Sequence, residues 1–155
     1  MILLVGKNSR GFTLVELIMV LLLISISMAV VIPNINKGLQ DHEVRSSALS
    51  LAAVARDLRS RALFDGVPQQ LVVNLAQNSY LIARTRQVRL PQDVKFASVD
   101  GGESVDHDVK RFYFFPNGSN MGGEIVLADS DKAVSYLVRL EPLTGRIEVS
   151  RGNQS

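Results

Sequence analysis

The chain has 155 residues, carries 17 lysines and arginines against 15 acidic residues, and contains no cysteine. Without cysteine it can form no disulfide, no thiolate nucleophile and no cysteine-based zinc site. Its formal net charge of +2 predicts no general attraction to nucleic acid or to acidic membrane surfaces. The length is sufficient for one anchoring segment and one modest domain.

A long apolar run lies near the N-terminus, from Phe12 to Ile32. As a helix rising about 1.5 Å per residue it spans roughly 31 Å, close to the ~30 Å hydrocarbon core of a bilayer. The basic residues Lys7 and Arg10 precede it, so the positive-inside bias places the N-terminus in the cytoplasm and the remainder outside. The run therefore predicts a transmembrane helix over residues 12–32.

The residues before this run predict how the chain is processed. An ordinary secretory signal has its small-residue cleavage site after the apolar core, which is then lost. Here the small residue is Gly11, directly before Phe12, so cleavage between these two keeps the apolar segment. Loss of residues 1–11 removes two of the 17 basic residues and leaves 144 residues with 15 basic and 15 acidic side chains. The mature chain is thus neutral.

One carboxylate, Glu16, lies inside the apolar run. A charge at this depth costs on the order of 2.5–3.5 kcal/mol on insertion scales, so a partner is expected. Cleavage creates a cation by freeing the amine of Phe12. Within one subunit the helix holds the two groups about one turn apart. In a helical stack, Glu16 could instead neutralise the Phe12 amine of a neighbouring subunit.

Residues 7–17 resemble the processing site of type IV pilins and of the pseudopilins of type II secretion. The resemblance implies that a prepilin peptidase removes the leader, residues 1–11, by cutting after Gly11 and then N-methylates Phe12. It gives Glu16 the family's role in assembly, between neighbouring subunits. The leader's basic residues correspond to Lys7 and Arg10.

Helical periodicity resumes after Pro33, which ends the apolar run and predicts a kink. We expect residues 33–65 to continue the helix on the periplasmic side, until a turn residue, a glycine and a proline stop it at residues 65–68. Steps of three and four residues place one apolar stripe along this helix: Val44, Ala48, Leu51, Ala55, Leu58 and Ala62. The stripe predicts packing on a sheet of the same molecule, and a lateral contact with neighbouring subunits stays open beside it.

Charged residues flank the stripe. Two acid–base pairs stand four residues apart in the favourable order and predict ion pairs on the helix surface: Asp41 with Arg45, and Asp57 with Arg61. Two further arginines, Arg56 and Arg59, lie on the same flanks.

After Pro68 the pattern changes to short β-type segments, which form a predicted head over residues 66–155. Turns are expected at residues 77–78, 129–132 and 144–145. About eight short strands beside a helix favour two small sheets. The predicted strands are Gln70–Leu75, Ser79–Ala83, Gln87–Leu90, Val94–Val99, Arg111–Phe115, Glu124–Leu127, Ala133–Leu140 and Arg146–Ser150.

Two stretches of this region carry a second resemblance. Residues 111–125 contain an aromatic strand, a Pro-x-Gly-Ser loop and a Gly-Gly pair, and residues 136–147 end in a Thr-Gly-Arg turn. Together they look like the FimT/GspH family, the H-type minor pseudopilins of type II secretion and their relatives in type IV pili. The resemblance implies an α+β, pilin-like fold, in which a long N-terminal transmembrane and amphipathic helix packs on an antiparallel β domain.

The same resemblance implies a structural role and no enzyme activity or cofactor. The chain would be a subunit near the tip of the periplasmic pseudopilus, which drives folded proteins across the outer membrane. Its implied partners are the prepilin peptidase, other minor and major pseudopilins, and inner-membrane lipid. Its implied location is the inner membrane, crossed once, with the N-terminus cytoplasmic and the head periplasmic.

Three clusters could suggest ligand chemistry, and each has a simpler interpretation. The glycines of residues 117–123 lack the following helix and Lys-Ser/Thr pair of a phosphate-binding loop, so a tight turn is expected. Residues 106–108, Asp-His-Asp, follow two glycines and are expected in a solvated loop. Residues 129–131, Asp-Ser-Asp, lack the further acidic ligand of a calcium loop. The sequence therefore predicts no catalytic and no metal site.

The alternative function is that of a FimT-like minor pilin that captures DNA or supports pilus assembly. Such relatives use a Gly-Arg-x-Arg motif, whereas this chain has a carboxylate, Glu148, at the second arginine position after Gly145 and Arg146. A carboxylate there removes one phosphate contact and adds a repulsion. Arg151 could substitute only in part, so nucleic acid is not an expected partner.

Overall fold

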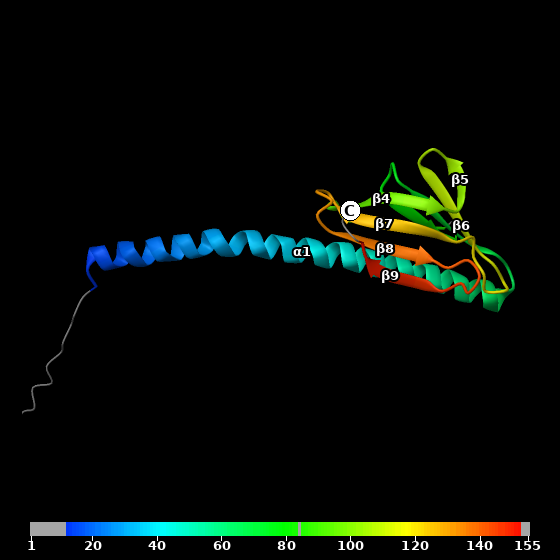
Figure 1. The fold of residues 1–155 in the computed structure, drawn as a ribbon, viewed down its shortest axis with the longest axis horizontal. Coiled ribbons are helices and arrows are strands. Elements are labelled where there is room, and N and C mark those ends of the chain that lie inside the picture. Colours follow the sequence, from blue (N-terminus) through cyan, green and yellow to red (C-terminus); the bar gives the residue numbers. More distant parts are fainter. Residues whose placement is uncertain (1–11, 84, 153–155) are drawn as a thin grey trace, which may run out of the picture. The chain divides into compact units, whose positions relative to one another are not determined.

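A computed structural model describes residues 12–83 and 85–152, with the backbone alone for residues 29–40. The predicted leader, including Lys7, Arg10 and Gly11, lies outside the described residues. The chain divides into two compact units at residues 37 and 38, and helix α1 (Leu14–Asp65) contributes to both. Figure 1 shows the elements in chain order.

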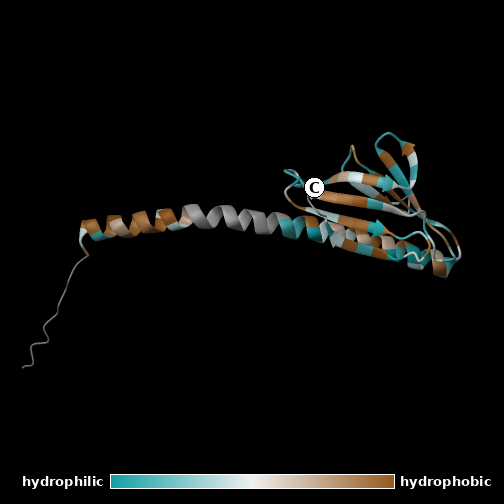
Figure 2. Cartoon of the chain, in the orientation of Figure 1, coloured by the Kyte–Doolittle hydropathy of each residue, from teal (hydrophilic) through white to brown (hydrophobic). Residues whose placement is uncertain are grey.

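In the first unit, α1 begins at Leu14, and every side chain from residue 12 to residue 28 is exposed. Figure 2 shows that this part of the helix is predominantly apolar. A search of the described residues for a helical segment long and apolar enough to cross a membrane finds none. Pro33 is assigned to the helix within the stretch described by its backbone alone, and the kink predicted there stays a prediction.

In the second unit, the rest of α1 is amphipathic. All six residues of the predicted stripe are fully buried, which confirms packing against the sheets of the same chain. The helix ends at Asp65, where Gly66 adopts a positive φ of 68° and donates its N–H to the carbonyl of Ala62. A glycine in this left-handed conformation satisfies a carbonyl of the last turn and stops the helix, as the sequence predicts.

The described part of the head contains nine strands in two antiparallel sheets, which confirms the predicted α+β class. The five-stranded sheet has the order β3-β2-β1-β6-β5, and the four-stranded sheet has the order β4-β7-β8-β9. The strands are β1 (Gln69–Asn74), β2 (Ser79–Ile82), β3 (Arg86–Arg89), β4 (Val94–Gly101), β5 (Glu103–Asp106), β6 (Val109–Phe114), β7 (Gly123–Asp129), β8 (Ser135–Leu140) and β9 (Ile147–Arg151).

The core joins the apolar face of α1 to the inner faces of both sheets, with Phe112 and Phe114 of β6 among its largest fully buried side chains. Glycines allow the two sheets to approach closely beside Phe112. A Cβ on Gly102 would lie 2.9 Å from the Phe112 ring, and one on Gly123, which belongs to the other sheet, would lie 2.7 Å from it. The glycine at the start of β7 is therefore needed for packing.

Two details differ from the sequence-based expectations. The solvated loop expected for residues 106–108 is wrong for Asp106, which ends the edge strand β5, paired with β6. This strand is absent from the predicted strands. All four of its side chains are exposed, so the sequence shows no apolar alternation that would reveal a strand. The predicted pair of Asp41 with Arg45 is also wrong: Asp41 pairs with Arg151 of β9 instead.

Candidate processing and assembly site

The start of α1 is fixed by a local cap. Thr13 precedes the helix, and its Oγ1 accepts the backbone N–H of Glu16 at 3.2 Å. The Thr13 carbonyl accepts the N–H of Leu17, also at 3.2 Å. Ser/Thr followed three residues later by Glu is the capping-box pattern, in which a side-chain oxygen satisfies a free N–H of the first turn. The sequence contains this capping pattern at Thr13 and Glu16. An interpretation of Glu16 only as a charge inside the membrane overlooks it.

The carboxylate of Glu16 has no partner among the described residues. Only its backbone N–H is hydrogen-bonded, although the carboxylate stands in the first turn, where the helix dipole favours a negative charge. Other polar side chains of the segment are satisfied within the helix: Ser25 Oγ donates to the carbonyl of Leu21 and Ser27 Oγ to that of Leu23, both at 2.8 Å. The Glu16 carboxylate thus differs from these side chains, because no described residue satisfies it.

In the head, one arginine joins the two loops that carry the second resemblance. Arg59 of α1 donates from Nε to the carbonyl of Gly118 at 2.9 Å and from a terminal nitrogen to the carbonyl of Thr144 at 3.1 Å. Arg56, one turn earlier, donates to the carbonyl of Ile147 at 2.9 Å. The sequence places both arginines on the flanks of the stripe. It does not reveal that their guanidinium groups donate to backbone carbonyls of loops and strands far along the chain.

A buried asparagine completes the junction of the two loops. Asn120 donates from Nδ2 to the carbonyl of Glu141 at 2.9 Å, and its Oδ1 accepts the N–H of Gly122 at 2.7 Å. Gly145 adopts a positive φ of 65°, and a Cβ there would overlap both the Gly118 carbonyl and the Arg59 side chain. The signature glycines therefore hold the fold together, in agreement with the expected turn rather than a phosphate site.

The Asp-His-Asp cluster lies on the outside of the head. His107 and Asp108 form the turn between β5 and β6, and the side chain of His107 is 95% exposed. His107 Nδ1 lies 3.1 Å from Asp108 Oδ1, and Asp106 Oδ1 accepts the backbone N–H of His107. Solvent surrounds the pair, and a catalytic pair needs a concave site that encloses its substrate. The expected solvated position is confirmed for His107.

The arginines of the DNA-binding alternative are both occupied. A terminal nitrogen of Arg146 lies 3.0 Å from Glu148 Oε1, and one of Arg151 lies 3.4 Å from Asp41 Oδ1. Asp41 also accepts the Tyr136 hydroxyl at 3.3 Å. Both guanidiniums that the DNA-binding alternative would use are therefore next to a carboxylate.

Asp129, in the cluster that could suggest calcium, is likewise committed to the fold. Its Oδ1 accepts the N–H of Val134 at 2.9 Å and closes the turn between β7 and β8. Its backbone carbonyl accepts the N–H of Lys132 at 3.0 Å. The expected turn at residues 129–132 is confirmed, and Asp129 serves to close it.

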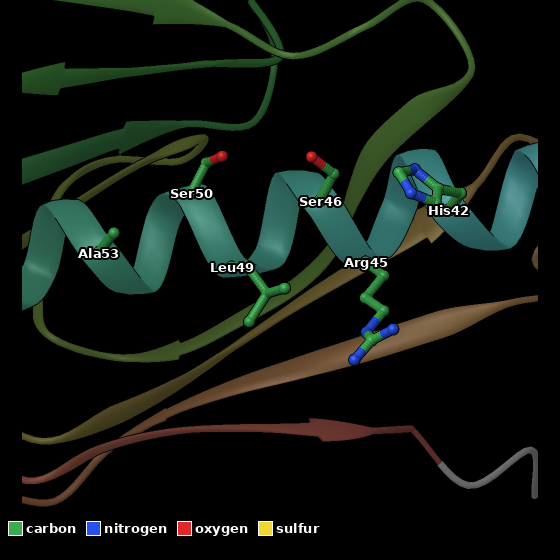
Figure 3. A pocket seen from close by; sticks show the side chains of 6 residues that line it. All are labelled: His42, Arg45, Ser46, Leu49, Ser50 and Ala53. Atoms are coloured by element: carbon green, nitrogen blue, oxygen red, sulfur yellow. The ribbon is translucent and has the colours of Figure 1, made fainter.

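A shallow hollow of about 340 Å³ lies on the outward face of α1 in the head. Figure 3 shows that its lining side chains all come from this one helix. Arg45 and Leu49 point to one side, while Ser46 and Ser50 point to the other. A single helix face cannot surround a small molecule with convergent polar groups, so this hollow is not a candidate active site.

Known proteins share both the N-terminal motif and the fold. Residues 6–32 match the model of the prokaryotic N-terminal methylation motif. Type II secretion system protein H of Xanthomonas campestris pv. campestris is 26% identical over 129 residues, which cover 82% of this chain and 76% of that protein. Two structures of the minor pseudopilin EpsH of Vibrio cholerae have the same fold. The chain is thus similar to H-type pseudopilins in sequence and in fold.

The structural likeness to EpsH covers most of both molecules. One structure superposes with a TM-score of 0.55 at 14% identity, over 70% of this chain and 97% of EpsH. The other gives the same TM-score at 13% identity, over 74% and 99%. At such identity the likeness establishes the fold. In this chain the matched methylation motif contains Gly11, Phe12 and Glu16, the residues that the sequence singles out.

Proposed function

We propose that this chain is a minor pseudopilin, a structural subunit near the tip of the periplasmic pseudopilus of a type II secretion system. The observation that carries the proposal is the exposed start of α1. The Glu16 carboxylate there has no partner among the described residues, and the apolar side chains up to residue 28 are exposed on every side of the helix. The head, by contrast, packs its apolar side chains into its own core. Exposed apolar surface of this kind requires a bilayer or neighbouring helices. The head then serves as the periplasmic part of the subunit.

In this proposal residues 12–32 lie in the inner membrane and the head lies in the periplasm. Prepilin peptidase removes residues 1–11 and methylates Phe12. Other minor and major pseudopilins are the partners of the mature chain. What supports a structural role is that the titratable cluster of the head, residues 106–108, is solvated.

The processing step has a direct test. Gly11→Val leaves the precursor uncut, because a peptidase that cuts after glycine must approach the backbone closely at that residue. Gly6→Val, in the same leader, is the matched control and is processed normally. Mass spectrometry of the membrane-extracted wild-type protein finds an N-methylated Phe12 terminus. A mature chain starting near residue 34 would instead identify the apolar run as an ordinary cleaved signal.

The assembly role of Glu16 is separated from its role in the helix cap by two substitutions. Glu16→Gln keeps a side chain suited to a capping box but removes the charge. Glu16→Ala removes both. If the carboxylate neutralises a neighbour's Phe12 amine, both variants insert into the membrane as well as wild type or better, and both lose crosslinking to other pseudopilins.

Two other outcomes would contradict this role. Full crosslinking and secretion by Glu16→Gln together with loss in Glu16→Ala would limit Glu16 to capping its own helix. Undiminished assembly by both variants would remove the proposed role altogether. Thr13→Ser keeps the hydroxyl that caps the helix and is the control for any change at this turn.

A further inference from the structure

Five apolar side chains at one end of the head, which we call the distal patch, are exposed to solvent: Leu63, Phe64, Val67, Met121 and Leu143. Phe64 is 94% exposed and Leu143 is 91% exposed, more than any apolar side chain described in the first unit. Scattered exposed leucines are normal on a protein surface. Two large side chains left almost wholly in water beside three more are not, and such a group indicates an interaction site.

Three segments far apart in the sequence bring the distal patch together. Leu63 and Phe64 belong to the last turn of α1, and Leu143 lies in the turn between β8 and β9. Arg59 connects that turn to the helix through the carbonyl of Thr144. The chain before Met121 is attached to the same turn by Asn120, whose N–H donates to the carbonyl of Pro142 at 3.1 Å. Figure 1 shows these turns at the end of α1.

The same contacts make the distal patch rigid before any partner arrives. Arg59 and Asn120 hold the loops through backbone carbonyls, and Gly118 leaves room for the Leu63 side chain, 3.4 Å from the position of its missing Cβ. Loops ordered in advance bind with a smaller loss of entropy. Two nearby arginines are paired with carboxylates, Arg61 with Asp57 and Arg146 with Glu148, while Asp65, next to Phe64 in the chain, has no ion pair among the described residues. The distal patch is therefore an apolar surface with a carboxylate beside it and little free positive charge.

The size of the distal patch decides what kind of partner can occupy it. A buried aromatic side chain contributes 150–250 Å², so the five residues together offer on the order of 500 Å². A stable interface between free proteins needs about 800 Å² per partner. The distal patch is therefore too small to hold a freely diffusing protein such as a secreted cargo. It is sufficient for a partner kept close by a second attachment, which raises the effective concentration at the surface.

Position along the chain identifies that partner. The helix enters the head near Asp41 and reaches the distal patch at Phe64, 23 residues or about 35 Å further along its axis. The distal patch thus lies at the end of the head remote from the point where the helix enters it. We propose that the distal patch binds the apolar surface of the head of a neighbouring anchored pseudopilin in the assembly. This inference rests on the proposed function.

The absence of cysteine makes the test specific. Full-length chains with single substitutions Phe64→Cys or Leu143→Cys are labelled in membranes with a thiol-reactive benzophenone and illuminated, and the products are identified by mass spectrometry. Leu49→Cys and Val105→Cys are matched controls, since both side chains are exposed and apolar but lie outside the distal patch. The expected result is a crosslink from residues 64 and 143 to another pilin-like subunit, at least about tenfold stronger than from the controls.

A second measurement separates docking from folding. Phe64→Ser with Leu143→Ser lowers recovery of the other pseudopilins with the full-length chain by about tenfold, because interface anchors are removed. Its thermal unfolding midpoint stays that of wild type, since both side chains are solvent-exposed. Leu49→Ser with Val105→Ser changes neither. Equal crosslinking from all four positions, or crosslinking to a secreted protein, would overturn the distal patch as a subunit interface. If wild type itself recovers no pseudopilin, the proposed function fails instead.

Discussion

The two parts of helix α1 differ in where their interactions are satisfied. Between residues 12 and 28 every side chain is exposed, and the one carboxylate, Glu16, has no partner in the described part of the chain. From Val44 to Ala62 the same helix buries a narrow stripe against two sheets, and its arginines bind carbonyls of distant loops. The first part needs surroundings that another molecule or a bilayer must provide, whereas the second finds them within the chain.

This difference explains how one helix can serve two tasks. A helix that is apolar on all sides gains stability only from lipid or from other helices, so its state depends on assembly. A helix with one apolar stripe is held by its own domain, here through the buried stripe of α1. The head is therefore the part whose stability responds to single substitutions inside it.

The largest expected effect concerns Gly145, where the head is most tightly closed. Gly145→Ala destabilises the head by about 3 kcal/mol or more, since it adds a left-handed alanine and forces the Arg59 side chain and the Gly118 carbonyl apart. The measurement is the urea unfolding midpoint of a fragment starting at residue 38.

Gly66→Ala is the matched control for this change. Gly66 has nearly the same positive φ, 68° against 65°, but nothing lies within 4 Å of its missing Cβ. Its substitution costs about 1 kcal/mol, the conformational part alone. Equal losses of unfolding free energy in the two variants would show that close packing against Arg59 and Gly118 adds nothing to the stability of the head. The second part of α1 would then depend less on its own domain than its buried stripe indicates.

Patterns that depend on nearby residues are predictable from the sequence, and long-range pairings are not. Steps of three and four residues fix the buried stripe, and Asp65 with Gly66 fixes the helix end. Strand β5 is hidden because all its side chains face water, so only its pairing with β6 defines it. The sequence likewise offers Asp41 a partner four residues away, whereas the fold brings Arg151 from the other end of the chain.

The candidate site divides in the same way. Glu16 is visible in the sequence because a carboxylate inside an apolar run costs free energy. The cap by Thr13 is equally local and could have been read from the Ser/Thr-x-x-Glu pattern. Arg59 gives no such signal: an arginine on a helix flank usually points into solvent, and only the placement of Gly118 and Thr144 gives its donors their acceptors.

A smaller effect tests whether the charges of the head are satisfied within it. Glu148→Arg frees Arg146 from its carboxylate and creates the Gly-Arg-x-Arg pattern at the surface. DNA binding by the head fragment then strengthens, and its dependence on salt steepens by about one unit of log–log slope for each phosphate that the new arginine pair neutralises. The measurement is fluorescence anisotropy with a short duplex at several salt concentrations.

Glu124→Arg is the control for this prediction. It breaks a comparable exposed pair, Arg139 Nε to Glu124 Oε1 at 2.8 Å, with the same change of charge on the same sheet. A similar rise in affinity would assign the effect to net charge alone. Micromolar or tighter binding by the unmodified head at physiological salt, abolished by Arg146→Ala and Arg151→Ala, would favour DNA capture over secretion.

The smallest effect tests the closed core through pH. Tyr80 of β2 is 4% exposed, and burial raises the pKa of its hydroxyl, an effect that nearby Arg86 partly offsets. The unfolded chain ionises this tyrosine near pH 10, while the folded chain keeps it protonated to higher pH. Stability from Tyr80 is therefore fully present below about pH 10 and is lost as the pH rises above it, because the unfolded state then binds fewer protons.

Tyr80→Phe removes this loss, so the variant's urea midpoint falls less than that of wild type between about pH 9 and pH 11, by an amount on the order of 1 kcal/mol or less. Other titrating groups act equally on both proteins and cancel in the difference. Arg86→Gln sharpens the test, since removing the cation raises the Tyr80 pKa further and steepens the decline. If the urea midpoints of wild type and Tyr80→Phe fall in parallel as the pH rises, water reaches the Tyr80 hydroxyl. The inner face of the five-stranded sheet would then be more open to water than the buried stripe of α1.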